Sequence, residues 1–231
     1  MLVDIKGIKF ERKLKPMSNV VNLSKGAVVN LSKKAPGLTN VTVGLGWDPA
    51  DKEKPAAKKG FFSKLFGGGE TEPVSTTQTI DCDAFALLLK NGHMKSRDDI
   101  VFFNNLRHRS GAVVHCGDNL TGDGDGDDEQ IQIFLDKLPS DYTEVVLAVN
   151  IYQAHSKGQN FGKISNCFIR LVNEKNREEM CRYDISNTSE YNDKTAVIMG
   201  QLQKVNDEWE FKAMGTGHDV RSISDVANMY N

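Results

Sequence analysis

A stretch rich in aspartate and glycine lies near the middle of the chain and is the clearest candidate for chemistry. Residues 117–131 read GDNLTGDGDGDDEQI, and six of the first thirteen residues are acidic while none is basic. Crowded carboxylates repel one another, so a folded loop of this composition loses stability unless a cation neutralises it. The glycines that alternate with Asp123, Asp125 and Asp127 permit backbone angles that bend the chain around an ion.

The ligand chemistry of this stretch favours calcium. Carboxylate and carbonyl oxygens select calcium or magnesium over zinc or copper. Magnesium keeps more of its water and uses fewer protein ligands, so the density of acids favours calcium. The stretch is not an EF-hand, because Asp128 stands where that loop needs glycine and Phe134 where it needs its last glutamate. A solvated acidic turn that binds no specific ion is the alternative.

The elements that must position these residues are predicted to be β-strands. Short runs of alternating apolar and polar residues cover 21–25, 29–33, 39–47, 77–89, 131–135, 143–152, 167–172, 177–185, 195–202 and 208–214. This spacing predicts an all-β fold, a two-sheet antiparallel β-sandwich with short peripheral helices. The first two runs share the word VNLSK and are predicted to be neighbouring strands. Residues 220–230 predict a C-terminal helix with Asp219 as its N-cap.

Composition narrows the class of protein. The chain of 231 residues has a net charge of −2, and its strongest charge cluster is negative, which argues against nucleic acid as the main partner. Its 4 cysteines are scattered without a C-x-x-C pair, which favours free thiols in a reducing compartment. Neither a signal peptide nor an apolar run long enough to span a bilayer is expected. A cytoplasmic protein without a transmembrane segment is the prediction.

We expect a mobile, charged N-terminal arm over residues 1–18 and a single β-sandwich domain over residues 19–231, interrupted by an insertion at 48–78. The insertion is rich in Lys, Pro and Gly and reads as a long loop. Within it, basic and aromatic residues cluster: Lys58, Lys59, Phe61, Phe62, Lys64, Leu65 and Phe66. They form either a flap that folds back on the domain or a weak anchor for a membrane surface or a partner.

Four segments together resemble the TerD-like family of bacterial tellurium-resistance and stress-response proteins. They are APGLTNVTVGLGWD (35–48), VFFNNL (101–106), the acidic stretch, and FGKISNCFIRLVN (161–173). The resemblance extends over roughly residues 19–215. It implies a calcium-binding β-sandwich with two adjacent Ca²⁺ ions, and a role in resistance to tellurite and other stresses. It also implies a cytoplasmic location, often near the inner face of the membrane.

The resemblance carries a set of oxygen ligands onto this chain: Asp118, Asn119, Asp123, Asp125, Asp127, Asp128 and Glu129 from the acidic stretch, Asp81 and Asp83 from a D-x-D strand element, and Asn104 and Asn105 from an Asn pair. Asp81 and Asp83 point to one side of a strand and are expected to form the opposite wall of the site. The Asn pair reads equally well as a polar turn. Thr79 stands where the family often has another aspartate, which puts a ligand of the second ion in doubt.

No catalytic motif is found, so we expect a non-catalytic protein. The sequence contains no G-x-S-x-G, P-loop or dinucleotide motif. His115 and Cys116 border the acidic stretch and fit ordinary packing better than redox or soft-metal chemistry. The expected role is that of a calcium-dependent adaptor for other stress-response proteins or for the inner membrane surface. A metal-dependent hydrolase that uses the acidic loop is the alternative.

Overall fold

The computed structural model describes residues 20–49, 80–117, 126–185 and 189–231. The predicted N-terminal arm, nearly all of the insertion and most of the acidic stretch therefore lie outside the described residues. All seven predicted docking residues also lie outside the described residues: Lys58, Lys59, Phe61, Phe62, Lys64, Leu65 and Phe66.

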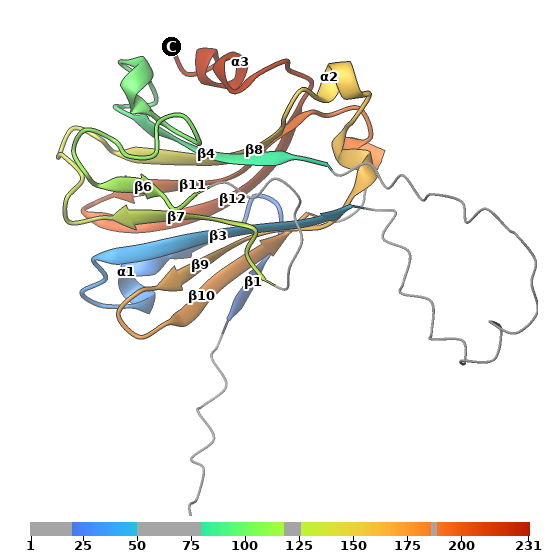
Figure 1. The fold of residues 1–231 in the computed structure, drawn as a ribbon. Helices are drawn as coiled ribbons and strands as arrows, with labels where there is room; N and C mark the ends of the chain where they lie inside the picture. Colours follow the sequence, from blue (N-terminus) through green and yellow to red (C-terminus); the bar gives the residue numbers. More distant parts are fainter. Residues whose placement is uncertain (1–19, 50–79, 118–125, 186–188) are drawn as a thin grey trace, which may run out of the picture.

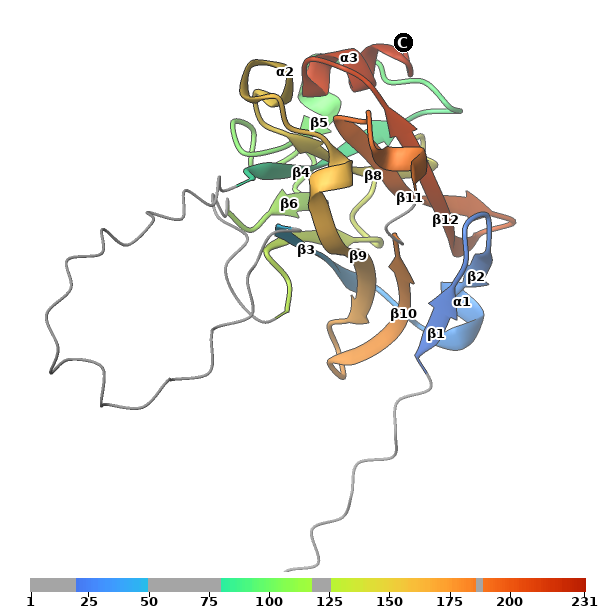
Figure 2. The same cartoon turned by 90° about the vertical axis from the view of Figure 1, so that its right-hand side faces the viewer.

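The described residues form two six-stranded sheets that stack face to face (Figures 1 and 2). The first sheet contains, in spatial order, β1 (Val21–Leu23), β10 (Glu178–Asp184), β9 (Ile164–Asn173), β3 (Asn40–Pro49), β7 (Glu129–Phe134) and β6 (Val113–His115). The second contains β2 (Val28–Asn30), β12 (Glu208–His218), β11 (Ala196–Val205), β8 (Glu144–Ile151), β4 (Cys82–Leu89) and β5 (Ile100–Val101). Among the described strands all pairs are antiparallel except β1 with β10. The predicted β-sandwich is confirmed.

The main core lies between the two sheets, and a smaller one covers the outer face of the second sheet. Strand β4 shows why, because all of its residues are buried. Its even-numbered apolar positions, such as Ala84 and Leu88, face the first sheet, whereas Phe85 and Leu87 face outward. The outward side chains pack against α3 (Ile223–Asn228), which lies over this face at the top of Figure 1. A strand buried on both sides reads as a continuous apolar run, as CDAFALLL does after its first two residues.

The helices are short and peripheral. They are α1 (Leu31–Lys34), α2 (Ala154–Lys157) and α3, together with the 3₁₀ turns η2 (Arg97–Asp99), η3 (Phe161–Lys163) and η4 (Ser189–Tyr191). The predicted C-terminal helix is confirmed but begins later than expected, and its N-cap is Ser222 rather than Asp219. Ser222 and Asp225 exchange side-chain-to-backbone hydrogen bonds and so form a reciprocal cap. Asp219 lies four residues before the first residue of the helix, Ile223, and does not cap it. No helix among the described residues is long and apolar enough to cross a bilayer.

The two VNLSK segments, residues 21–25 and 29–33, do not form neighbouring strands as predicted. In the first, Val21–Leu23 is β1 and pairs with β10, whereas β2 begins at Val28 and pairs with β12 in the other sheet. In the second, Leu31 begins α1, because the Asn30 side chain accepts a hydrogen bond from the Lys33 N–H and caps the helix. Leu31 is fully buried in the core, which fixes this turn. Identical sequence therefore takes two structures according to its tertiary surroundings.

Candidate functional site

The structure brings the start of β4 close to both ends of the acidic stretch. Strand β5 pairs only with Ala86 and Leu87, so β4 has no strand partner on that edge at Ala84. Two buried side chains from the first sheet seal the gap. Glu129 Oε2 accepts a hydrogen bond from the Ala84 N–H at 2.7 Å, and His115 Nε2 lies 3.1 Å from the Ala84 carbonyl oxygen. Both polar groups of this edge residue are thereby satisfied across the sandwich.

His115 also holds the first residue of the acidic stretch. Its Nδ1 accepts from the Gly117 N–H at 3.3 Å, which places a ring proton on Nε2. That proton points to the Ala84 carbonyl, with Glu129 Oε2 at 3.3 Å. His115 is 3% exposed, and this inward position fits the packing interpretation of the sequence. Burial raises the pKa of the neighbouring Cys116 thiol, the opposite of what a reactive thiolate needs.

The other end of the acidic stretch, Gly126–Glu129, is called the loop stem below. Its three acidic side chains point to three different places. Glu129 enters the core as described, and Asp128 Oδ2 accepts from the backbone N–H of Trp47 on β3 at 2.7 Å. Asp127 lies on the outer face of the first sheet, between Gln130 and Arg170. The loop stem is therefore fixed by protein donors at each of its acidic positions.

Asp127 forms the strongest of these anchors. Its Oδ1 accepts from Arg170 Nε at 2.6 Å, and its Oδ2 accepts from Arg170 Nη2 at 3.0 Å and Gln130 Nε2 at 2.9 Å. The carboxylate is 2% exposed, and Arg170 also binds Glu179 at 2.9 Å. The hydrogen bonds that Arg170 donates to Asp127, followed by the one it donates to Glu179, hold the pKa of its guanidinium above the usual value. A bidentate pair of this kind fixes geometry as well as charge.

Two glycines of β3 make room for the loop stem. A Cβ on Gly44 would overlap the Asp127 carboxylate, and one on Gly46 would lie 2.7 Å from the Gly126 carbonyl oxygen and overlap the Phe168 ring. Glycine inside a strand weakens the strand unless another group approaches closely there. The two glycines at alternate positions of TVGLGW therefore mark where the loop stem approaches β3. Strand prediction from apolar alternation did not use this signal.

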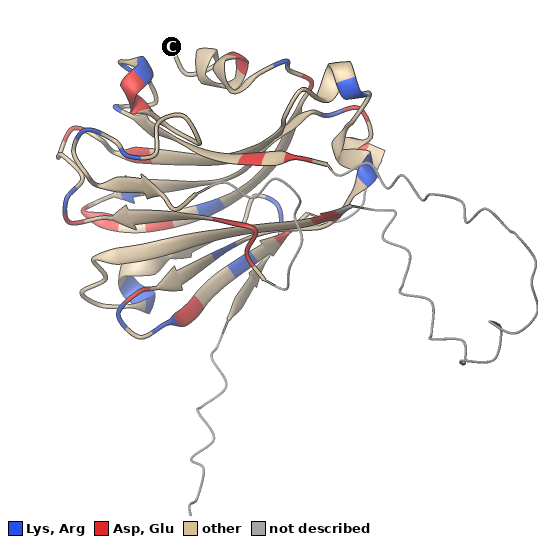
Figure 3. Ribbon diagram, in the orientation of Figure 1, with Lys and Arg blue, Asp and Glu red and all other residues tan. Residues whose placement is uncertain are grey.

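Asp81 and Asp83 lie on the other side of β4 from Glu129. Asp83 is 4% exposed and shares the outer face with Phe85, and its cross-strand partner is Asn150 of β8. Pairing continues to Asp81, whose carbonyl accepts from the Tyr152 N–H, so alternation places both carboxylates on the predicted common side. In the view of Figure 3, acidic segments at the starts of β4 and β7 and at the end of β3 gather toward one end of the sandwich.

The Asn pair forms a turn beside this face. Asn105 and Phe102 exchange backbone hydrogen bonds, and the Asn105 side-chain amide donates to the Ile100 carbonyl at 2.6 Å. Asn104 is exposed. The polar-turn interpretation therefore describes Asn105, while a ligand role stays a prediction for both residues. Four further predicted ligands lie outside the described residues: Asp118, Asn119, Asp123 and Asp125.

Calcium fits the described residues only in part. Asn150, 4% exposed, has a side-chain oxygen with no hydrogen-bond partner among the described residues, on the same face as Asp83. A buried amide oxygen of this kind is costly unless a donor or cation satisfies it, and oxygen is the ligand that calcium takes. Within the described ranges, however, no three His, Cys, Asp or Glu side chains are grouped to hold a metal. These residues supply at most one wall of a calcium shell.

Sequence reasoning missed a further buried carboxylate, Asp99. Its Oδ1 accepts from the Tyr142 hydroxyl at 2.6 Å and lies 3.3 Å from His108 Nε2, while His108 Nδ1 lies 2.7 Å from Ser110 Oγ. Burial opposes ionisation of Asp99, but the hydrogen bonds from Tyr142 and from the Lys95 N–H hold its pKa below the usual value. Burial followed by the Asp99 bond raises the pKa of Tyr142 to about 12.

The Asp99–His108–Ser110 chain has the order of a hydrolase triad but the setting of a structural network. His108 is 1% exposed, and the Ser110 hydroxyl accepts from the Ala112 N–H. The Asp99 carboxylate is shared with Tyr142, Ser96 and Lys95 rather than reserved for the histidine. The network ties η2 to the segments around residues 108 and 142. No short sequence motif joins residues 99, 108 and 142, so only the fold reveals it.

Comparison with known proteins gives a consistent result. The TerD-domain family model matches residues 19–230. The stress response protein SCP2 of Bacillus subtilis (strain 168) is 42% identical over 210 residues, covering 91% of this chain and 98% of the relative. The tellurium resistance protein TerD of Serratia marcescens is 41% identical over 199 residues, covering 86% and 91%. A solved homologue of telluride resistance protein (TerD) from Streptomyces coelicolor A3(2) superposes with a TM-score of 0.58 at 20% identity, covering 84% of this chain and 99% of the other.

Proposed function

Because this chain belongs to the TerD family of tellurium-resistance and stress-response proteins, we propose that it acts as a calcium-dependent, non-catalytic adaptor. One observation carries the proposal. The buried Asp83 carboxylate and the orphaned Asn150 oxygen share a face, at the strand whose edge is sealed by both ends of the acidic stretch. The proposed oxygen ligands and the two ends of the acidic stretch therefore meet at β4.

In this proposal the acidic residues divide their tasks. Asp81, Asp83 and Asn150 supply one wall of oxygens, and Asp118, Asn119, Asp123 and Asp125 supply the other. Asp127, Asp128 and Glu129 anchor the loop through the protein donors described above, and the two walls together hold one or two Ca²⁺ ions. The ion removes the repulsion among the carboxylates and so orders the loop as a surface.

The adaptor part of the proposal assigns the ordered surface to a stress-response protein or to the inner membrane surface, in the cytoplasm. Its support is the basic-aromatic cluster in the insertion. Basic and aromatic side chains of this kind bind membrane surfaces weakly and reversibly.

Thermal unfolding tests the calcium step. Calcium at about 100 times its dissociation constant should stabilise the native protein by about 2.7 kcal/mol, since it binds the folded state alone. Magnesium at equal concentration should do much less. Asp83→Asn, nearly isosteric, should remove the calcium effect, while Asp141→Asn on the exposed surface should keep it. An equal calcium shift in Asp83→Asn would exclude the β4 wall.

Vesicle flotation tests the adaptor step. The intact chain should float with anionic vesicles more strongly in calcium than in chelator, and a Phe61→Ser, Phe62→Ser, Phe66→Ser variant should not. A Val205→Ser variant, which changes an exposed apolar residue of the sandwich, is the control. Equal flotation of the triple variant would remove the membrane surface and leave a protein partner. Turnover of phosphoesters that Asp125→Asn abolishes would replace the adaptor with the hydrolase.

A further inference from the structure

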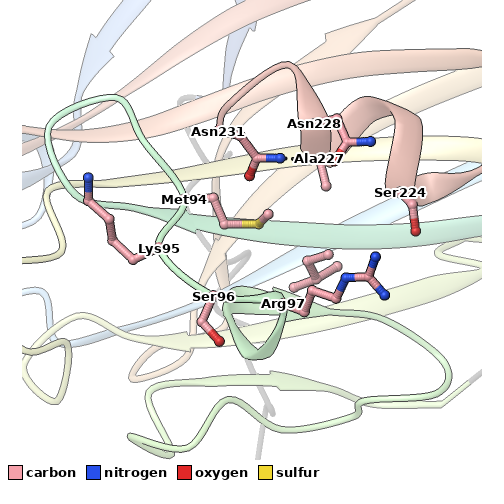
Figure 4. Close-up of a pocket in the computed structure, with 9 residues that line it drawn as sticks. Met94, Lys95, Ser96, Arg97, Ser224, Ala227, Asn228 and Asn231 are labelled. Carbon is pink, nitrogen blue, oxygen red and sulfur yellow. Dashed lines mark hydrogen bonds between the residues drawn. The ribbon is translucent and has the colours of Figure 1, made fainter.

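A cavity of about 250 Å³ lies at the opposite end of β4 from the acidic stretch. One wall is the segment Met94–Arg97 that leads into η2, and the other is α3 with the residues after it. Figure 4 shows these two segments facing each other across the space. They are far apart in sequence, and neither belongs to the calcium site proposed above.

Hydrogen bonds within and between the two walls hold them in place. Ser96 and Asp99 cap η2 reciprocally, and the buried Asp99 carboxylate also accepts from the Lys95 N–H at 3.1 Å. Ser222 and Asp225 cap α3 in the same way. The Met94 N–H donates to the Tyr230 carbonyl at 2.7 Å and ties the two walls together. A preformed pocket loses less entropy on binding than a mobile one.

The side chains that line the cavity carry positive charge. Lys95 and Arg97 line it, no Asp or Glu does, and neither cation has an ion-pair partner among the described residues. Of the neighbouring acids, Asp99 is held in its network, Asp225 in its cap, and Asp98 lies 3.9 Å from Arg109. In Figure 4 the Arg97 guanidinium extends toward Ser224, whereas the Lys95 ammonium points away from the centre. Arg97 is therefore the cation that a bound ligand meets.

The polar lining is arranged to donate hydrogen bonds. The Ser96 hydroxyl accepts from the Asp98 N–H at 3.1 Å as the cap of η2, and in Figure 4 it points away from α3. The Asn228 side-chain oxygen accepts from the Asn231 amide at 2.9 Å, a bond drawn in Figure 4, which leaves the Asn228 NH₂ group to donate. Ser224 adds a second hydroxyl. Met94 and Ile100 provide an apolar floor.

We propose that this cavity is a binding site for a small ligand that carries an oxyanion group, of which phosphate is the simplest. Arg97 pairs with two oxygens through its planar fork, and the Ser224 hydroxyl and the Asn228 amide donate to the remainder. The apolar floor receives the organic body of an ester. The site is independent of calcium.

Nuclear magnetic resonance titration of the full chain at constant ionic strength tests the site, with inorganic phosphate and phenyl phosphate as probes. Saturable shifts are expected at the backbone amides of Ser96, Arg97, Ser224 and Asn228. Arg97→Gln should weaken binding about tenfold or more, because it removes a charge-assisted pair. Arg107→Gln, an exposed arginine outside the cavity, should bind as the unaltered chain does.

Tighter binding of phenyl phosphate supports an organic ester as the ligand, and equal binding supports a free oxyanion. Absence of saturable shifts with both probes at millimolar concentration overturns the site. So does unchanged affinity in Arg97→Gln, or shifts spread over surface lysines without preference for the cavity. Addition of a calcium chelator should leave the affinity unaltered, which separates this result from the fate of the calcium proposal.

Discussion

The loop stem and the β4 acidic pair, Asp81 and Asp83, contain the same kind of side chain in opposite settings. Each stem acid receives protein donors: Arg170 and Gln130 for Asp127, the Trp47 N–H for Asp128, the Ala84 N–H for Glu129. Asp83 lies on the outer face of β4, opposite Asn150, a buried amide whose oxygen accepts nothing from the described residues. The stem acids serve as anchors, and we propose that the β4 face is where an added cation gains most.

The comparison is tested most severely by removing the partner of Asp127. Arg170→Met should destabilise the protein by about 3 kcal/mol, because a buried carboxylate is left without its cation. Arg177→Met, at an exposed pair with Glu174, should cost less than about 1 kcal/mol. Chemical unfolding in the presence of a chelator measures both. Similar small losses in the two variants would show that Asp127 is not an anchor.

Gly44→Ala tests the same anchor, Asp127, from the strand against which it packs. The added methyl group displaces the Asp127 carboxylate and should cost about 2 kcal/mol, as overpacking does. Because it acts through the Asp127–Arg170 pair, its effect should shrink in the Arg170→Met background rather than add. A double-mutant cycle by chemical unfolding gives the coupling. Full additivity would separate the glycine from the pair.

Asn150→Leu tests the β4 face. It should raise stability without calcium and reduce the stabilisation that calcium gives. Without calcium, replacing an unsatisfied buried amide with an apolar group of similar shape should stabilise the protein by about 1 kcal/mol. With calcium, the variant should gain less from the ion than the unaltered chain, because one oxygen has been removed. Melting curves with calcium and with chelator measure both signs. A destabilised variant with unaltered calcium response would place Asn150 outside the site.

The pH dependence of stability sharpens the comparison with a third carboxylate, Asp99. Burial lowers the pKa of His108 below its ordinary 6.5, although Asp99 opposes this, and burial lowers that of His218 similarly. Below pH 6.5 the unfolded chain binds protons that the native chain resists. The free energy of unfolding should therefore decrease as the pH is lowered below 6.5, by at most about 1.4 kcal/mol per pH unit for each histidine.

The measurement is chemical unfolding between pH 7 and pH 5, with chelator present. His108→Gln and His218→Gln should each reduce the slope. A slope that is unaffected by either substitution would assign the pH dependence to the carboxylates. The Asp99 network should respond equally with and without calcium, since no predicted calcium ligand belongs to it.

Alternation predicted most of the strands and the sandwich, since a half-buried strand carries its own pattern. The VNLSK words show the limit of that reasoning, because Asn30 and buried Leu31 turn the second copy into a helix. The string of acids predicted a cation site but not the division of tasks within it. That division depends on Gly44, Arg170 and Ala84, which come from other strands and meet the loop stem only in the folded sandwich.

The central claim, that the β4 face binds calcium together with the acidic stretch, is tested most directly by calorimetric titration of calcium into the chelator-treated protein. We predict a saturable heat for one or two ions in the unaltered chain. Asp83→Asn should weaken it about tenfold or more, whereas Asp141→Asn should not. Absence of heat at millimolar calcium in the unaltered chain, or full binding by Asp83→Asn, would contradict the claim.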